Sequence, residues 1–271
     1  MDFLNDAFIS KLFFGSIIGA AVLELVFPLR PLSYRPGPRW LANIGLGAVN
    51  ILMTRWLLPI TGAMLASGYG LGLLNYLTLP VWMQVVAGVL ILDVMNYWVH
   101  RVMHMNPLLW RLHRIHHTDM DVDFTTGVRH HPFEGIVVLI ITTAAIFALG
   151  LSPLAVAAYQ AGRAGVDVLS HANIRLPSGL DRMLRWVVIT PDMHRIHHSA
   201  DQPETDSNYG TLLPWWDRLF KSYRDAPALG QTGMVLGLED WRNEQDLTIS
   251  GLALLPFRSA PLPGSPPQAE G

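Results

Sequence analysis

The chain has 271 residues, which fits one large domain or two small ones, and 51% of them are hydrophobic. Charged residues make up only 15% of the chain, where about 25% is usual for soluble proteins, and the mean hydropathy is +0.30, so the composition favours a membrane protein. The net charge of −2 gives no indication of nucleic-acid binding, and the absence of cysteine excludes disulfides, thiolate zinc sites, iron–sulfur clusters and thiol catalysis.

Apolar segments in the N-terminal part of the chain are long enough to cross a bilayer core of about 30 Å as helices. They cover residues 8–27, 40–66 and 80–99. We expect the first to be a retained span, because Asp2 and Asp6 precede it where a cleaved signal peptide would carry basic residues. The next connection carries Arg30, Arg35 and Arg39, so the positive-inside rule predicts that it is cytoplasmic.

Two further apolar segments, 134–151 and 153–170, predict a helical hairpin of near-spanning length. Ser152 and Pro153 have the residue types of an N-cap and a first helical residue. The hairpin returns the chain to the side that it left, so the pattern places the histidines on the cytoplasmic face. We therefore predict an all-α integral membrane fold of about four transmembrane helices with a cytoplasmic histidine-rich helical cap.

The domain organisation follows from the same pattern. We expect one membrane-embedded domain over residues 1–255, with a histidine-rich core at 93–220, located in the inner or plasma membrane. Residues 256–271 are rich in Pro, Gly and Ser, which predicts a disordered tail.

All 11 histidines lie between His100 and His198, and the pentapeptide His-Arg-Ile-His-His occurs twice in that window. Residues three or four apart share one face of a helix. Each copy therefore presents its histidines together, and a further pair lies just upstream of the first copy. These clustered histidines are His100, His104, His113, His116, His117, His194, His197 and His198.

The clustering predicts a metal site. A lone histidine in a protein core is usually explained by a satisfied hydrogen bond, but many crowded imidazoles are costly to bury without a metal. Eight to ten histidines are enough for two transition metals with room for a small molecule. Imidazole suits Zn, Cu, Fe and Ni, so the spacing does not choose among them. A nitrogen-bound pair of iron ions beside a membrane suits O₂ activation and attack on a lipid C–H bond.

Other polar residues in the window extend the candidate site. His171 ends a predicted helix, on the same face as Arg163 and Asp167, and we expect it to be a ligand. Arg163 and Asp167 predict an i, i+4 ion pair, either functional or merely self-neutralising. One of His130 and His131 could close the site, and the spacing leaves this choice open.

Asp93 and Asn208 are candidates for positioning the metal site. Asp93 shares a helix face with His100 and could orient an imidazole by accepting its second N–H, and its alternative partner is Arg55. Asn208 follows the second pentapeptide and is a candidate to contact a metal-bound water. Its neighbours Asp206, Ser207 and Gly210 are equally typical of a simple turn.

These motifs resemble the fatty acid hydroxylase superfamily, which includes sterol desaturases and bacterial lipid hydroxylases. The resemblance covers about residues 93–220 and rests, in order, on Asp93, Tyr97-Trp98-Val99-His100-Arg101, His104, His113 to His117, Arg129, His131-Pro132, Glu134, His171-Ala172-Asn173, His194 to His198, Asp206 to Gly210, and Trp216-Asp217. Lys221 and Ser222 depart from the pattern, because they stand where family members often have Gly and Thr.

The resemblance implies an integral membrane enzyme with two Fe ions, or Zn as a substitute metal, that uses O₂ and external electrons. Carried over by position, it adds His131 and His171 to the clustered ligands and prefers His131 to His130. It implies hydroxylation of a sterol, a fatty acyl chain or a related lipid. The sequence shows no fused haem or flavin domain, so a separate electron-transfer protein is the expected partner.

Two alternatives remain at this point. A desaturase of the same family shares the first C–H abstraction with a hydroxylase. A non-catalytic membrane protein that binds or transports metal would place its ligands inside a pore, with acids lining several spans.

Overall fold

A computed structural model describes residues 6–33, 36–68 and 72–259 of the chain. Over these residues the regular structure is helical, with two isolated β-bridges and no named strand, which confirms the predicted all-α class. Asp2, Arg35 and the end of the predicted tail, 260–271, lie outside the described residues. The long helices are α1 Asp6–Val26, α2 Pro36–Gly68, α3 Val81–Met105, α5 Pro132–Leu149 and α6 Pro153–His171.

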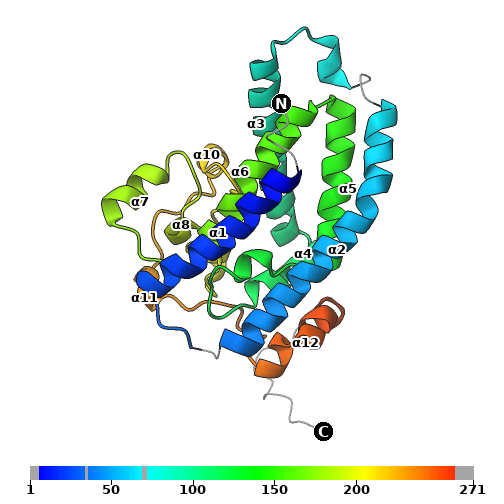
Figure 1. Cartoon of the computed structure of the whole chain (residues 1–271). Helices are drawn as coiled ribbons and strands as arrows, with labels where there is room; N and C mark the ends of the chain where they lie inside the picture. The colour runs from blue at the N-terminus through cyan, green and yellow to red at the C-terminus, as the bar shows by residue number, and fades with distance from the viewer. Residues whose placement is uncertain (1–5, 34–35, 69–71, 260–271) are drawn as a thin grey trace.

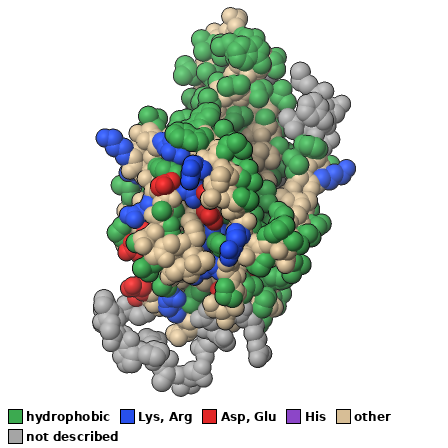
Figure 2. Space-filling model, turned by 90° about the vertical axis from the view of Figure 1, so that its left-hand side faces the viewer, with side chains coloured by type: hydrophobic (Ala, Val, Ile, Leu, Met, Phe, Trp, Pro, Cys, Tyr) green, Lys and Arg blue, Asp and Glu red, His purple; other side chains and the backbone are tan. Residues whose placement is uncertain are grey.

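Most of the short helices lie toward one end of the molecule. In Figure 1 the long helices α2, α3 and α5 reach the upper end, where η2 joins α2 to α3, while α7, α8, α11 and α12 lie lower in the view. Figure 2 shows mostly hydrophobic side chains on the upper part of one face and charged side chains on the lower part. The short elements are α4 Pro107–His117, α7 Ser178–Leu184, α8 Pro191–His197, α9 Gln202–Thr205, α10 Trp215–Leu219, α11 Gly230–Gly233, α12 Ile249–Leu254, η2 Leu73–Tyr76, η3 Thr126–Val128, η4 Glu244–Leu247 and η5 Leu255–Phe257.

Three helical segments among the described residues are long and apolar enough to cross a membrane, namely Ala7–Val26, Val81–Met105 and Pro132–Leu149. The other predicted spans also form helices, α2 and α6, but they are not among these three. Both carry several polar side chains, of which Arg55 and Gln160 are exposed. Helix α2 packs against α5, and α6 packs against α1 and α3.

Helix α6 carries the predicted ion pair to the histidine site. The Arg163 Nε atom lies 2.8 Å from Asp167 Oδ2, so the i, i+4 pairing is confirmed. Arg163 also donates from Nη1 to Asn96 Oδ1 on α3 at 3.2 Å. Arg163 therefore connects α6 to α3 in addition to balancing the charge of Asp167.

Side-chain caps fix the starts of α4, α6 and α8, three of the helices that carry histidines. Asn106 caps α4 by accepting from Leu108 N at 3.0 Å and Leu109 N at 3.2 Å, with Pro107 as the first helical residue. Ser152 caps α6 as expected, accepting from Ala155 N at 3.3 Å. Thr190 caps α8 in the same way. Since a cap fixes where a helix begins, it also fixes which way each histidine of that helix points.

A buried ionic network locks α4 against α2. Arg39 belongs to α2 and not to the predicted loop, and only 4% of it is exposed. Its Nη1 atom lies 2.9 Å from Asp119 Oδ2, and its Nη2 atom contacts Asp123. Arg129 is fully buried beside it and donates to Asn43 Oδ1 at 2.8 Å and to Ile115 O at 2.8 Å. These buried contacts therefore fix the position of α4, which carries the first pentapeptide, relative to α2.

The predicted start of the disordered tail is corrected by the structure. Residues Leu255–Phe257 form η5, in which Leu255 is fully buried against the cluster that contains Ile115 and Leu252. Arg114 of the first pentapeptide donates to Leu255 O at 2.5 Å. The ordered domain thus continues past residue 255, because this segment covers the outer side of α4.

Candidate metal centre

Nine buried histidines meet where the ends of α3 and α6 approach α4 and α8. They fall into two groups, each with its potential ligand atoms within 4.8 Å of one another. Group one consists of five residues, and group two of four. Group one is His100, His104, His113, His117 and His197, and group two is His116, His171, His194 and His198.

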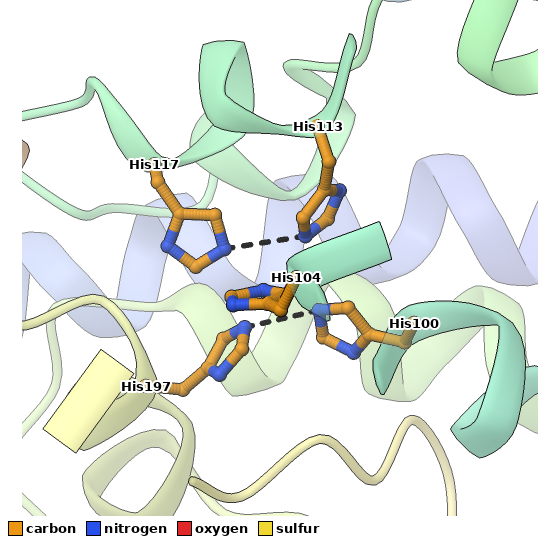
Figure 3. Close-up of side chains that lie close together, drawn as sticks. All are labelled: His100, His104, His113, His117 and His197. Atoms are coloured by element: carbon orange, nitrogen blue, oxygen red, sulfur yellow. Dashed lines mark hydrogen bonds between the residues drawn. The ribbon is translucent and has the colours of Figure 1, made fainter. Parts of the chain in front are cut away.

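Group one points inward from three helices, as Figure 3 shows. His100 and His104 come from the last two turns of α3, His113 and His117 from α4, and His197 from α8. The Nε2 atoms of His117 and His113 lie 3.2 Å apart, and those of His197 and His100 lie 3.0 Å apart.

Group two has the same kind of geometry. The Nε2 atom of His171 lies 3.1 Å from that of His116 and 2.9 Å from that of His194. The Nε2 atoms of His198 and His194 lie 3.3 Å apart. His171 closes this group from the last turn of α6, so the expectation that it joins the clustered histidines agrees with its position.

Each copy of the pentapeptide contributes to both groups. In the first copy the adjacent residues His116 and His117 face different groups, and in the second copy His197 and His198 do so. The prediction that each copy presents its histidines together is therefore wrong, because adjacent residues on a helix are about 100° apart. The groups adjoin, with the rings of His117 and His198 stacked at 4.7 Å between centroids.

The spacing of the nitrogen atoms fits metal ions at both groups. A metal–imidazole bond is about 2.0–2.1 Å long, so two ligands at a right angle bring their nitrogens to about 3.0 Å. The Nε2 pairs described above lie between 2.9 and 3.3 Å apart. Without a metal, two Nε2 atoms at such a distance can form at most one weak hydrogen bond. A shared metal ion would instead accept the lone pairs of both nitrogens.

The Nδ1 atoms on the far side of five rings have acceptors, which fixes the tautomer. His100 donates to Tyr209 O at 2.8 Å, His197 to Ser207 O at 2.7 Å, and His171 to Asp167 O at 2.5 Å. Because a carbonyl oxygen only accepts, each of these rings carries its proton on Nδ1 and turns an unprotonated Nε2 inward. Carboxylates do the same for the other two, as Glu134 lies 2.9 Å from His113 Nδ1 and Asp206 lies 3.3 Å from His104 Nδ1.

Burial keeps the histidines in the neutral form that binds metals. For His116, His117, His194 and His198, desolvation is the main cause that lowers the pKa well below 6.5, and neighbouring histidines lower it further. The pKa of His197 falls to about 3 for the same reasons. At neutral pH these rings are therefore uncharged, and each has one nitrogen without a proton, as a metal ligand must.

The structure does not bring His131 to either group. Its Nδ1 atom caps α5 by accepting from Phe133 N at 3.2 Å, and its Nε2 atom faces Ala253 O. His130 lies against the site instead, stacked on His116 with 4.4 Å between ring centroids. His130 Nδ1 lies 3.0 Å from Glu134 Oε1, the same oxygen that holds His113. The preference for His131 over His130 is therefore not retained.

Asp93 is buried, but it contacts neither a histidine ring nor Arg55. It accepts from Trp216 Nε1 at 2.7 Å and from Leu213 N at 3.1 Å. Asp93 thus fastens the segment before α10 to α3. Neither partner that the sequence suggested for Asp93, an imidazole or Arg55, is found. Its actual partners lie more than 100 residues away in the sequence, so local spacing could not identify them.

Asn208 uses its whole side chain inside the protein. It adopts a left-handed backbone conformation with φ 52°, donates to Met193 O and Arg224 O at 3.0 Å each, and accepts from Arg224 N at 2.9 Å. These contacts favour the turn interpretation over contact with a metal-bound water. Asn208 holds α8 to the segment that follows α10.

Asp217 and Glu134 position the site, although the sequence reasoning did not single them out as site residues. Asp217 accepts from Tyr209 N and Gly210 N at 2.8 Å each and from Ser222 Oγ at 2.7 Å. It thereby fixes the carbonyl group that holds His100. The sequence signals for these residues are weak without the fold. Glu134 is an acid four residues after His130, and Asp217 is an acid inside an aromatic stretch after Asn208.

A small cavity of about 60 Å³ adjoins the metal centre. Its lining includes His100, His116 and His171 and the Arg163–Asp167 pair. A water molecule occupies about 30 Å³ in the liquid, so the space suits O₂ or water and not a whole lipid.

Comparisons with known proteins agree with this geometry. The fatty acid hydroxylase family model matches residues 85–222. Ornithine lipid hydroxylase OlsE of Rhizobium tropici is 31% identical over 162 residues, which cover 58% of this chain and 48% of that protein. Alkylglycerol monooxygenase of Homo sapiens is 29% identical, with 52% of this chain and 30% of that protein covered. Very-long-chain aldehyde decarbonylase GL1-4 of Oryza sativa subsp. indica is 27% identical, with 59% and 28% covered.

The chain spans less than half the length of each of these three relatives. No solved structure matches it significantly.

Proposed function

The chain belongs to the fatty acid hydroxylase family, and we propose that it is a membrane enzyme that uses two iron ions and O₂ to hydroxylate a lipid. The main support is the pair of adjoining histidine groups at the ends of apolar helices, with Nε2 atoms at metal-ligand spacing. The proposed ligands are the nine histidines of groups one and two, without His131. Zinc is a substitute metal that the same nitrogens would accept.

The residues of the chain prepare the site for this chemistry. Two iron ions held there would supply the oxidising power for attack on a C–H bond. The carbonyl groups of Tyr209 and Ser207 hold His100 and His197 in the ligand tautomer. Burial of the histidines excludes bulk water, and the small cavity leaves space for a molecule of the size of O₂ beside them.

Metal content and activity together test this assignment. His116→Ala removes a ligand from group two, and His197→Ala removes one from group one, so each should lower bound iron by at least about one ion per chain and abolish product. His131→Asn is the matched control, because it removes a histidine outside both groups and keeps a cap acceptor for α5. Full activity in either alanine variant would contradict the proposal.

Product analysis separates hydroxylation from desaturation. Lipids from cells with and without the protein should differ under air and not under nitrogen. A product that gains one oxygen atom supports hydroxylation, whereas a product that loses two hydrogen atoms supports desaturation. An air-independent difference would contradict O₂ chemistry altogether.

We further propose that the metal centre lies on the cytoplasmic face and receives electrons from a separate protein. The positive connection after α1 and the single face shared by the short helices support this orientation. The chain contains no cysteine, so a single Asp225→Cys variant, at an exposed position of the cap, gives an unambiguous label. Labelling by a membrane-impermeant thiol reagent in intact cells, without lysis, would contradict the orientation.

A further inference from the structure

A second and larger cavity, of about 390 Å³, lies between α1, α2 and α6. It shares Gly127 and His130 with the small cavity at the metal centre. His130 in turn stacks on His116 of group two. One end of the larger cavity is therefore formed by the ring of His130, which stacks on the proposed ligand His116. Its volume falls in the range of about 300–1,000 Å³ that is usual for small-molecule sites.

The cavity lies at membrane depth. Helix α1 is one of the three segments apolar enough to span, and α2 packs against α5, which is another. The lining includes apolar side chains such as Phe13 and Ile51, but it is not purely apolar. Its polar members are Ser10, Asn50, Thr54, Arg55, His130 and Gln160.

Arg55 is the one fixed charge among the described residues of this lining, which contain no carboxylate. It forms no ion pair with any described residue, and Asp93, which the sequence suggested as an alternative partner, binds Trp216 instead. An unpaired guanidinium at membrane depth is costly, and such a residue usually marks a ligand or ion site. Arginine binds carboxylate and phosphate with two parallel hydrogen bonds.

We propose that this cavity holds the lipid, and that Arg55 binds an acidic group of it, a carboxylate or a phosphate. Gly47 lies beside Val128 at the end near the metals, and Arg55 is eight residues further along α2. At 1.5 Å per residue the cavity extends about 12 Å along that helix. Arg55 would thus hold the acidic group away from the metals and set which carbon of the chain reaches them. The link to oxidation rests on the proposed function, whereas the binding does not.

Binding to the purified full chain in nanodiscs tests this directly. The probes are a fatty acid, the fatty alcohol of equal chain length, and the matching lysophosphatidic acid. Loss of one charge-assisted contact corresponds to about tenfold or more in affinity. Wild type should therefore bind at least one acid about tenfold more tightly than the alcohol. Arg55→Gln should remove that preference, and Arg55→Lys should restore part of it.

The controls separate this proposal from the reaction. Lys11→Gln removes a cation from α1 that is exposed and does not line the cavity, so the preference should persist. Bound iron should be unchanged in Arg55→Gln, because Arg55 is not a metal ligand. Equal affinity of wild type for the acids and the alcohol, or an unchanged preference in Arg55→Gln, would overturn the assignment.

The acid whose affinity falls more in Arg55→Gln identifies the group as carboxylate or phosphate. An acid preference that depends on Arg55, without any O₂-dependent product, would leave the binding site standing while the proposed reaction fails. An O₂-dependent product without an acid preference would support the proposed reaction and overturn the proposed binding site.

Discussion

The Nδ1 atom of His100 donates to the main-chain oxygen of Tyr209 at 2.8 Å, and the N–H of Gly210, which belongs to the same peptide unit as that oxygen, donates to Asp217 at 2.8 Å. A carboxylate outside the metal groups thus controls the orientation of a ligand through one peptide unit. The interaction is also buried, since Asp217 is 0% exposed. This relationship gives a direct prediction.

Asp217→Asn should weaken iron binding without removing a ligand. The amide keeps one acceptor and loses the charge that holds two N–H groups, so the Tyr209 carbonyl is positioned less firmly. Substitution of such outer partners typically lowers metal affinity about 10–100-fold. Iron titration of the purified apoprotein measures the effect, and Asp225→Asn at the exposed surface is the control. Wild-type affinity in Asp217→Asn would show that Tyr209 is held by other contacts.

Asp217 also predicts a pH dependence of stability. Burial raises its pKa from 3.8 to about 6, although Ser222 and two backbone N–H groups oppose the rise by donating to it. Between these values the unfolded chain has lost the proton and the folded chain keeps it. The free energy of unfolding should therefore fall as pH rises through this window and level off above about pH 6. Thermal unfolding from about pH 4 to about pH 7 should show a smaller fall for Asp217→Asn, and equal slopes would refute this.

Glu134→Gln should loosen His113. One oxygen of Glu134 accepts from both His113 and His130, and the amide cannot serve both rings as well as the carboxylate does. We expect iron affinity to fall about tenfold or more. His130→Ala is the informative comparison, because it leaves the His113 contact in place and should cost less. A larger loss in His130→Ala would mean that Glu134 acts chiefly through His130.

Lys221→Gly should stabilise the protein, whereas Asn208→Gly should not. Both residues have positive φ, 60° for Lys221 and 52° for Asn208. Glycine removes a conformational cost of about 1 kcal/mol at such a position. Asn208, however, holds Met193 and Arg224 by three hydrogen bonds that glycine would lose. Thermal unfolding should rank Lys221→Gly above wild type and Asn208→Gly below it. The reverse ranking would contradict this account.

The left-handed backbone also explains the departure noted at residue 221. The resemblance places glycine there, and the structure shows why glycine fits. The exposed Lys221 adopts the same conformation at an energetic cost and leaves the metal groups untouched.

Local spacing predicted the helices, the cap at Ser152, and the set of clustered histidines, because these depend on residues a few positions apart. It did not predict how His116 and His117 divide between two groups, since that requires knowing where α3, α6 and α8 approach. The choice of His130 over His131 depends on the path of the chain before α5. The partners of Arg39 and Asp93 lie far away in sequence, so only the fold reveals them.

The division of each pentapeptide between the two groups has a consequence for metal loading. Helix α4, and α8 with its C-cap residue His198, each carry histidines of both groups, so each would help to hold both ions. An ion held at one group would keep α4 and α8 in the arrangement that the other group needs. We therefore expect the two ions to load cooperatively, so that a singly loaded protein is scarce at every metal concentration.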